Sequence, residues 1–194
     1  MAAESRNVWL DHPGGYGIVS RGLHWVMAVL FAWQFAGVVL GVVAEDAPIA
    51  AFVGGSHKTL GLMLLLLVLA RGIWGFVNAP RRPAHEGALG KAAVAGHLVL
   101  YALMIVVPSL ALFRQYGSGR SFEPFGLALM PGFEGPIAWL TAPANLAHGF
   151  LGWTLLVLIA GHIAMALIHR HLWQDDAIGR MTRGRSAPLG SVSD

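Results

Sequence analysis

Cysteine is absent from this chain of 194 residues, and charged residues are scarce. The lack of cysteine excludes disulfide bonds, iron–sulfur clusters, thiolate metal ligands and covalently attached c-type haem. Asp, Glu, Lys and Arg together make up only 12% of the residues, whereas soluble domains carry about 25%. Because 56% of the residues are hydrophobic, the composition indicates an integral membrane protein rather than a soluble domain.

The hydrophobic residues are gathered into four long stretches. A helix needs about 20 apolar residues to cross the hydrocarbon core of a bilayer, and each stretch reaches that length. They cover residues 18–43, 57–77, 92–113 and 145–169. None contains Asp or Glu, which argues against an ion-coupled transporter. The sequence therefore predicts an all-α, integral membrane four-helix bundle within residues 1–180, followed by a polar tail over residues 181–194.

The basic residues are divided unevenly between the two sides of such a bundle. Four crossings bring both termini and the connection between the second and third stretches to one side. That side carries ten of the thirteen Lys and Arg residues, namely Arg6, Arg21, Arg71, Arg81, Arg82, Lys91, Arg170, Arg180, Arg183 and Arg185. The other side carries Lys58, Arg114 and Arg120. Because basic loops stay in the cytoplasm, we expect both termini there. Topology thus explains the pI near 9.8, and we expect membrane lipid rather than nucleic acid as the partner.

Four histidines lie within these apolar stretches, at His24, His57, His148 and His162. A histidine in a bilayer is costly and by default marks a functional site. His148 and His162 are 14 residues apart in one stretch, hence within about 40° of one helix face and roughly 21 Å apart along its axis. In alternating helices His24 shares the depth of His162, and His57 that of His148. Two facing histidines at each of two depths predict two b-type haems with bis-histidine iron ligation, suited to electron transfer.

Two alternatives to this ligand set remain open from spacing alone. A single histidine in a membrane can instead hydrogen-bond across helices, although four at two matching depths are hard to explain in this way. His97, at the inner end of the third stretch, lies at a depth that also suits it as the partner of His162. The spacing does not decide between His97 and His24.

Further residues near the histidines suit a bound haem and a second redox partner. Arg21, Lys58 and Arg71 can pair with haem propionates through charge-assisted hydrogen bonds, although Arg21 and Lys58 can equally reach lipid headgroups. His169 follows His162 by seven residues, on nearly the same face and roughly 10 Å nearer the cytoplasm. A titratable group in that position suits a quinone headgroup that exchanges protons with water. The alternative for His169 is an ordinary interfacial histidine.

Two glycines lie one helical turn from the histidines of the outer pair. Gly61 follows His57 by four residues, and Gly152 follows His148 by four. The missing side chains would let a porphyrin approach the helix backbone. Glycine is also ordinary in helix packing within membranes.

Four segments, spread over about residues 16–180, together resemble one known family. They read Arg21-Gly-Leu-His24-Trp25, then His57-Lys-Thr-Leu-Gly61, then Gly96-His97-Leu-Val-Leu-Tyr101 followed by Pro108, and finally Gly161-His162-Ile-Ala-Met-Ala-Leu-Ile-His169 followed by Trp173-Gln-Asp175. This pattern resembles the bacterial cytochrome b561 family, small four-helix membrane cytochromes with two b-type haems. The resemblance implies that His24 and His162 hold the cytoplasmic haem and that His57 and His148 hold the periplasmic one. It leaves His97 beside the haem or at the quinone side.

The resemblance also implies a function in the bacterial inner membrane. It implies one-electron transfer between a periplasmic donor, with superoxide as a specific candidate, and the membrane quinone pool, by a monomer or a homodimer. If the chain is an enzyme, it is then a superoxide:quinone oxidoreductase. The alternative is a haem-b anchor that relays electrons for a larger dehydrogenase or hydrogenase. One departure concerns His148, which the family often flanks as Trp-His-Glu and which here lies between Ala147 and Gly149.

Overall fold

The computed structural model describes residues 8–82 and 87–184, and these residues form helices joined by turns and loops. The elements are α1 (Ile18–Val43), α2 (Pro48–Gly55), α3 (His57–Val77), the short 3-10 helix η1 (Ala79–Arg81), α4 (Gly87–Gly117), the 3-10 helix η2 (Pro124–Gly126), α5 (Ala138–His171) and α6 (Ala177–Thr182). Four segments are long and apolar enough to cross a membrane: α1, α2 with α3, α4, and α5. The predicted all-α membrane fold with four spans is confirmed.

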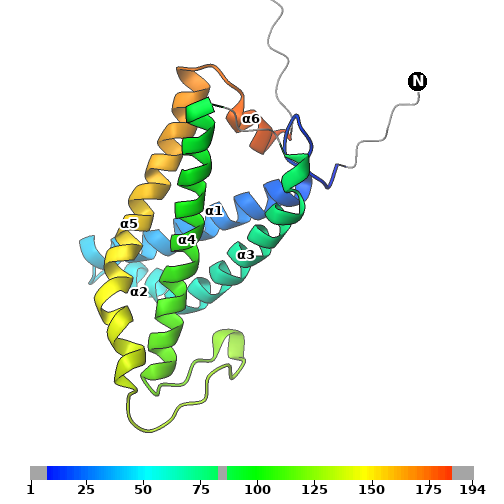
Figure 1. Cartoon of the computed structure of the whole chain (residues 1–194). Coiled ribbons are helices and arrows are strands. Elements are labelled where there is room, and N and C mark those ends of the chain that lie inside the picture. Colours follow the sequence, from blue (N-terminus) through cyan, green and yellow to red (C-terminus); the bar gives the residue numbers. More distant parts are fainter. Residues whose placement is uncertain (1–7, 83–86, 185–194) are drawn as a thin grey trace, which may run out of the picture.

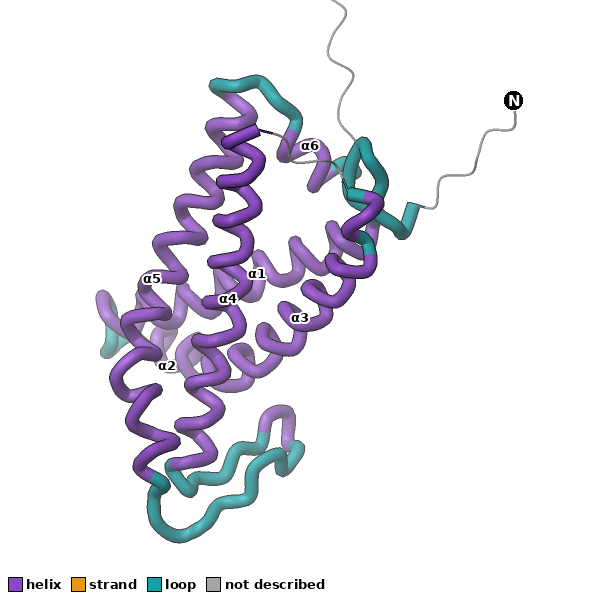
Figure 2. The backbone as a smooth tube through the Cα atoms, in the orientation of Figure 1, coloured by secondary structure: helices purple, strands orange, loops and turns teal. Residues whose placement is uncertain are grey.

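The four long helices form two antiparallel pairs. The helices α4 and α5 lie side by side, while α1 and α3 form a second pair that crosses the first obliquely (Figure 1). We call the end where α1 begins and α5 ends the terminal end, because the first and last described residues lie there. The opposite end, with α2 and residues 118–137, is called the loop end (Figure 2). The two ends lie far apart along the long pair.

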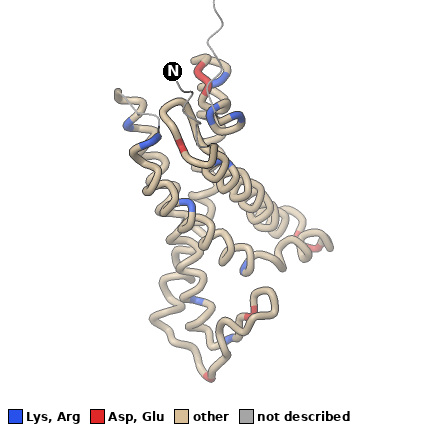
Figure 3. Tube along the Cα trace, turned by 90° about the vertical axis from the view of Figure 1, so that its right-hand side faces the viewer, with Lys and Arg blue, Asp and Glu red and all other residues tan. Residues whose placement is uncertain are grey.

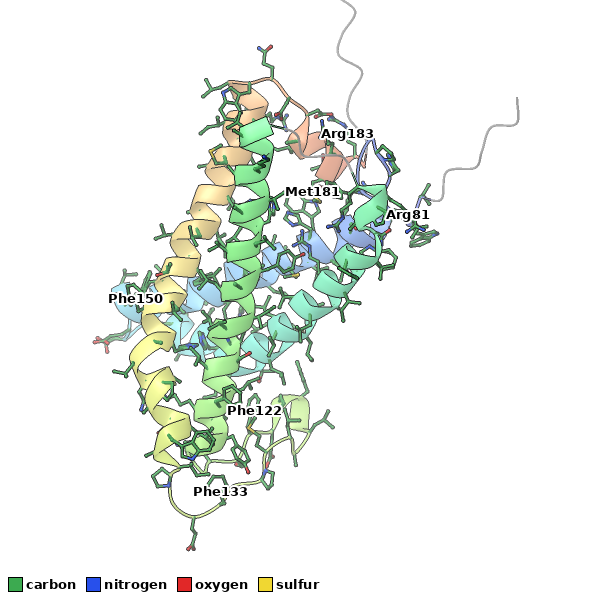
Figure 4. The ribbon with its side chains drawn as sticks, viewed as in Figure 1. Arg81, Phe122, Phe133, Phe150, Met181 and Arg183 are labelled. Atoms are coloured by element: carbon green, nitrogen blue, oxygen red, sulfur yellow. The ribbon has the colours of Figure 1, made fainter. Side chains whose placement is uncertain are left out.

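The core is small and lies where the two pairs cross. Each long helix contributes one buried residue to it, namely Met27 from α1, Val68 from α3, Met104 from α4 and Leu155 from α5. Most remaining apolar side chains point outward, as Phe150 does from α5 (Figure 4), where 72% of its surface is exposed. Such an apolar exterior is suited to lipid, because acyl chains are as apolar as these side chains and no hydrophobic effect favours burying them.

Three helices differ from those expected from the apolar stretches. The helices α4 and α5 extend beyond residues 92–113 and 145–169 at both ends, by two residues at the end of α5 and by four to seven elsewhere. Helical backbone hydrogen bonds continue past the last apolar residue, so the length of the apolar stretch is shorter than the helix when the helix projects from the bilayer. The helix α2 lies between the first two predicted stretches, where no helix was expected. Pro48 starts it as a first-turn proline, and Ala50 and Val53 are buried.

The connection between α4 and α5 folds back onto the loop end. Phe122 is only 7% exposed and pairs with Met130 in an isolated antiparallel bridge. Within the connection, Phe122 lies near the lower ends of the helices (Figure 4). The Gln115 side chain donates hydrogen bonds to the carbonyls of Arg120 and Ser121, each at 3.1 Å. The connection is therefore held as a cover over this end of the bundle.

At the terminal end, two segments are tied to α1 and α3. The buried Asp11 carboxylate accepts hydrogen bonds from the Gly17 amide and from Arg82 Nε, each at 2.9 Å. Side chains of α1 hold α6 through its backbone carbonyls. Arg21 Nη1 donates to the Thr182 carbonyl at 2.6 Å, and Trp25 Nε1 donates to the Met181 carbonyl at 3.1 Å. The end of the predicted polar tail, residues 185–194, lies outside the described residues.

Charged residues lie mainly toward the ends of the helices. Lys and Arg are more frequent at the terminal end than at the loop end among the residues drawn in Figure 3. This distribution agrees with the unequal count of basic residues along the sequence, with Arg6 and Arg185 outside the described residues.

Candidate functional site

Two of the four histidines meet near the loop end. His57 is the first residue of α3, and it faces His148, which lies in the interior of α5. Their ring centroids are 6.2 Å apart, and the ring planes are inclined at 78°. His148 Nδ1 lies 3.0 Å from the Val107 carbonyl oxygen in α4. A carbonyl only accepts, so Nδ1 carries the hydrogen and Nε2 keeps a lone pair for a metal.

A cavity of about 470 Å³ opens beside this pair. Its walls come from α1, α3, α4 and α5, with Phe122 of the connection closing one side. Gly61, Gly149 and Gly152 all line it, and a side chain added at Gly149 or Gly152 would meet nothing within 4 Å. The volume is within the range of ligand pockets, about 300–1,000 Å³. The predicted open space beside His57 and His148 is therefore present, and the glycine that replaces a family carboxylate after His148 widens it.

The other two histidines meet nearer the terminal end. The ring centroids of His24 in α1 and His162 in α5 are 6.4 Å apart, with an inclination of 68°. His97 of α4 also approaches His162, at 5.2 Å between centroids. Arg71 of α3 lies against this group, with its Nη2 atom 3.3 Å from His24 Nδ1 and its guanidinium 5.4 Å from the centre of the Tyr101 ring.

The ring spacing distinguishes between the two partners of His162. Two metal–imidazole bonds of about 2 Å each, extended to the ring centres, separate two axial imidazoles by roughly 6 Å. The His24–His162 and His57–His148 spacings of 6.4 and 6.2 Å match this value, whereas the His97–His162 spacing of 5.2 Å is shorter. The geometry thus favours His24 where spacing along the sequence left the choice open.

The helix packing leaves room between the histidines of each pair. The backbones of α4 and α5, of α1 and α3, and of α3 and α4 pack closely. Within the described residues, α5 packs far less closely against α1 or α3, the two helices that carry the opposing histidines. No group of three or more His, Asp or Glu residues in this part of the chain could hold a metal ion. The histidines are therefore arranged to work in facing pairs with something between them.

The remaining sequence candidates have distinct surroundings. Arg21 reaches the Thr182 carbonyl, and its buried Nε has no hydrogen-bond partner in the described part of the chain. Lys58 is exposed and lines the loop-end cavity. His169 is half-buried and contacts the Asp175 carboxylate through Nδ1. The Trp173 ring packs edge-on against the imidazole of His169, with the centroids 4.6 Å apart.

The structure adds residues that the sequence analysis did not assign to the loop-end cavity. Arg114 and Arg120, which the sequence offered as outer basic residues able to attract a small anion, both line it. Gln34 of α1 also lines it, and its buried Oε1 atom has no partner in the described residues, although its amide donates to the His57 carbonyl at 3.1 Å. A polar residue inside an apolar stretch was the available signal for Gln34. The Val107 carbonyl left no such signal, because every residue has one.

The cavity gives a direct test of what it holds. Replacing Gly152 with leucine should fill the space beside His148 and lower the bound haem by about one equivalent per chain, because a branched side chain occupies the slot that the porphyrin needs. Haem content follows from the pyridine haemochrome assay on detergent-purified protein. Gly41→Leu is the matched control, since Gly41 is also exposed to open space but lies away from the cavity. Equal haem content in both variants would show that the cavity is not the haem site.

Comparison with known proteins identifies the family. The family model for prokaryotic cytochrome b561 matches residues 15–184. Cytochrome b561 homolog 2 of Escherichia coli K12 is 26% identical over 193 residues, covering 92% of this chain and 96% of that protein. The probable superoxide oxidase CybB of Yersinia pestis is 25% identical, with 86% and 94% covered. Cytochrome b561 homolog 1 of Escherichia coli K12 is also 25% identical, with 82% and 92% covered.

The residues of this chain fit the haem b that the family implies. Each histidine pair has the spacing of two axial ligands, and the loop-end pair adjoins a large cavity flanked by glycines. The three basic side chains at the same cavity suit the propionate edge of a porphyrin. With four membrane-spanning segments and a family match over residues 15–184, the chain belongs to the prokaryotic cytochrome b561 family of haem b electron-transfer proteins of the membrane.

Proposed function

We propose that this cytochrome carries two haem b groups and moves single electrons between an outer donor and the quinone pool. His24 with His162, and His57 with His148, would supply the axial nitrogens. The observation that carries the proposal is the pair of nearly equal ring spacings, 6.4 and 6.2 Å. When bound, a bis-histidine haem supplies a six-coordinate one-electron centre that changes oxidation state without binding a further ligand.

The excess of basic residues supports a cytoplasmic position for the terminal end. Ten of the thirteen Lys and Arg residues belong to that side, and positive residues are retained in the cytoplasm. The loop end, with His57 and His148, then faces the periplasm of a bacterial inner membrane. Lipid surrounds the apolar exterior of the protein, which functions as a monomer or a homodimer.

The loop end supports superoxide as the outer donor. Arg114 and Arg120 line both the large cavity and an adjoining one of about 390 Å³, which also contains Ser118, Thr141 and Asn145. Neither arginine has an ion pair within the described residues, so their charges are available to attract a small anion. Two superoxide anions each lose one electron and leave as dioxygen. One quinone takes up the two electrons with two protons and becomes quinol.

The terminal end supports quinone as the acceptor. His169 lies in the last turn of α5, beyond His162, and its Nδ1 contacts the Asp175 carboxylate. That contact orients the ring and leaves Nε2 to exchange a proton with a quinone oxygen. His97 lies at the same end with an exposed ring near His162, which suits a place beside the haem or the quinone.

Charge reversal at the two cavity arginines tests the proposal. Replacing both Arg114 and Arg120 with glutamate should slow superoxide-driven haem reduction by about tenfold or more at low salt, because attraction becomes repulsion. The rate is measured by stopped-flow absorbance of the reduced haem, over a range of ionic strengths. Arg170→Glu, an exposed change at the terminal end, is the control.

The salt dependence distinguishes the outcomes of this experiment. The native rate should fall as salt is added, and the double variant should lose that dependence or reverse it. If both proteins react equally and with equal salt dependence, superoxide is not attracted through this cavity. If neither is reduced by superoxide but both accept electrons from a larger soluble dehydrogenase or hydrogenase, the protein is a relay subunit.

A further inference from the structure

The two histidine pairs differ in what surrounds one ring nitrogen. At the loop end, His148 Nδ1 donates to the Val107 carbonyl at 3.0 Å. At the terminal end, His24 Nδ1 lies 3.3 Å from Arg71 Nη2. A guanidinium has only donors, so the side chain of Arg71 cannot accept a hydrogen bond from that imidazole. One pair thus has an acceptor behind its ligand, and the other has a positive charge.

These two surroundings act on a haem iron in opposite directions. A hydrogen bond from Nδ1 to an acceptor makes an imidazole a more basic ligand. A more basic ligand stabilises the ferric state and lowers the reduction potential. A positive charge close to the ligand opposes the additional charge of ferric iron and raises the potential. The contacts of His148 and His24 therefore separate the potentials of the two centres.

The charge of Arg71 acts with little screening. It is half-buried between α1 and α4, and within the described residues it forms no ion pair. Its other contact is the face of the Tyr101 ring. Lys58, Arg114 and Arg120 line the loop-end cavity, but they are more exposed than Arg71, so water and salt weaken their effect on the loop-end centre even where they pair with a propionate. If Arg71 turned from His24 to a haem propionate, it would still raise the potential, because it would neutralise a negative charge.

We propose that Arg71 makes the centre at His24 and His162 the more oxidising of the two, so that electrons run downhill from the loop end to the terminal end. In that transfer the loop-end centre loses one electron and the terminal-end centre gains it. The inference rests on the proposed function, because it needs both haems. It assigns to Arg71 the role of a residue that sets a direction, in addition to any contact with a propionate.

Spectroelectrochemical titration of the holoprotein tests this assignment. Arg71→Gln should lower the higher of two midpoint potentials by an amount equal to about a tenfold change in the equilibrium constant, ~59 mV for one electron. The lower potential should move little. Arg71→Lys keeps the charge and should keep most of the potential. Arg81→Gln removes an exposed charge of the same end, whose guanidinium donates to the Val77 carbonyl, and should change neither potential.

A second pair of variants tests the order of potentials without changing Arg71. His57→Ala should remove the loop-end haem and leave a single midpoint potential, the higher one. His24→Ala should remove the terminal-end haem and leave the lower one. The opposite order, or equal shifts of both potentials in Arg71→Gln, overturns the inference while two bound haems still support the proposed function. The pyridine haemochrome ratio of the native protein is measured before any titration. A ratio of one haem per chain would contradict the proposed function itself.

Discussion

Replacing His24 with alanine should remove one of two haems per chain, whereas replacing His97 should leave both. The reason is the ring spacing, since His24 lies 6.4 Å from His162 and His97 lies 5.2 Å from it. A bis-histidine site that loses one axial ligand holds its haem by the other nitrogen alone. The pyridine haemochrome ratio and the reduced low-spin spectrum of the purified proteins measure the change.

The outer pair provides an independent comparison. His148→Ala should also lower the content from two haems to one, and the double change with His24→Ala should remove both. His12→Ala, at a histidine outside the membrane-spanning helices, is the control. If the His97 variant loses a haem and the His24 variant keeps two, the inner ligand pair is His97 with His162. If no purified variant or native protein contains haem, the histidines serve as interhelical hydrogen-bonding groups.

Much of this geometry could be predicted because membrane helices alternate in direction. Alternation fixes the depth of a residue from its position in its helix, and this reasoning placed His24 near His162 and His57 near His148. The approximate bounds predicted for α1 and α3 agree with the helices observed, since these helices nearly coincide with their apolar stretches. The structure brings the rings of both predicted pairs together.

Other features depend on tertiary contacts that hydropathy does not record. The two helix pairs cross obliquely (Figure 1), and hydropathy alone does not indicate that Met27, Val68, Met104 and Leu155 come together in one buried cluster. The short helix α2 was missed because its apolar residues are too few to span a bilayer. The folding of the 118–137 connection over the cavity depends on Phe122, one aromatic residue among several in that segment.

The same limit applies to the groups behind the histidines. The sequence shows Arg71 within an apolar stretch, but not that it faces His24. It shows His169 seven residues beyond His162, but not which carboxylate meets it. Asp175 and Asp176 both follow α5, and only the fold directs Asp175 to His169 while its neighbour pairs with Arg183. Orientation of side chains beyond a helix end is set by the turn, where Gln174 adopts a positive φ of 54°.

Asp175 and His169 should together control quinone reduction at the terminal end. The Asp175 carboxylate accepts the Ala177 amide at 3.2 Å through one oxygen and contacts His169 Nδ1 through the other, so it is fixed on both sides. That arrangement orients the ring and selects one tautomer. His169→Ala should lower the rate of electron transfer to a soluble ubiquinone analogue by about a hundredfold. Asp175→Asn should lower it by about tenfold, because the ring remains but loses its orientation.

The haem content must stay unchanged for this result to concern quinone. His169→Ala and Asp175→Asn should both retain two haems that are reduced from the outer side at the native rate, with only their reoxidation by quinone slowed. His171→Ala, an exposed histidine two residues further on, is the matched control and should reoxidise normally. Normal reoxidation in the His169 variant would place quinone elsewhere and leave the exposed ring of His97 as the next candidate, because it lies at the same end and contacts His162.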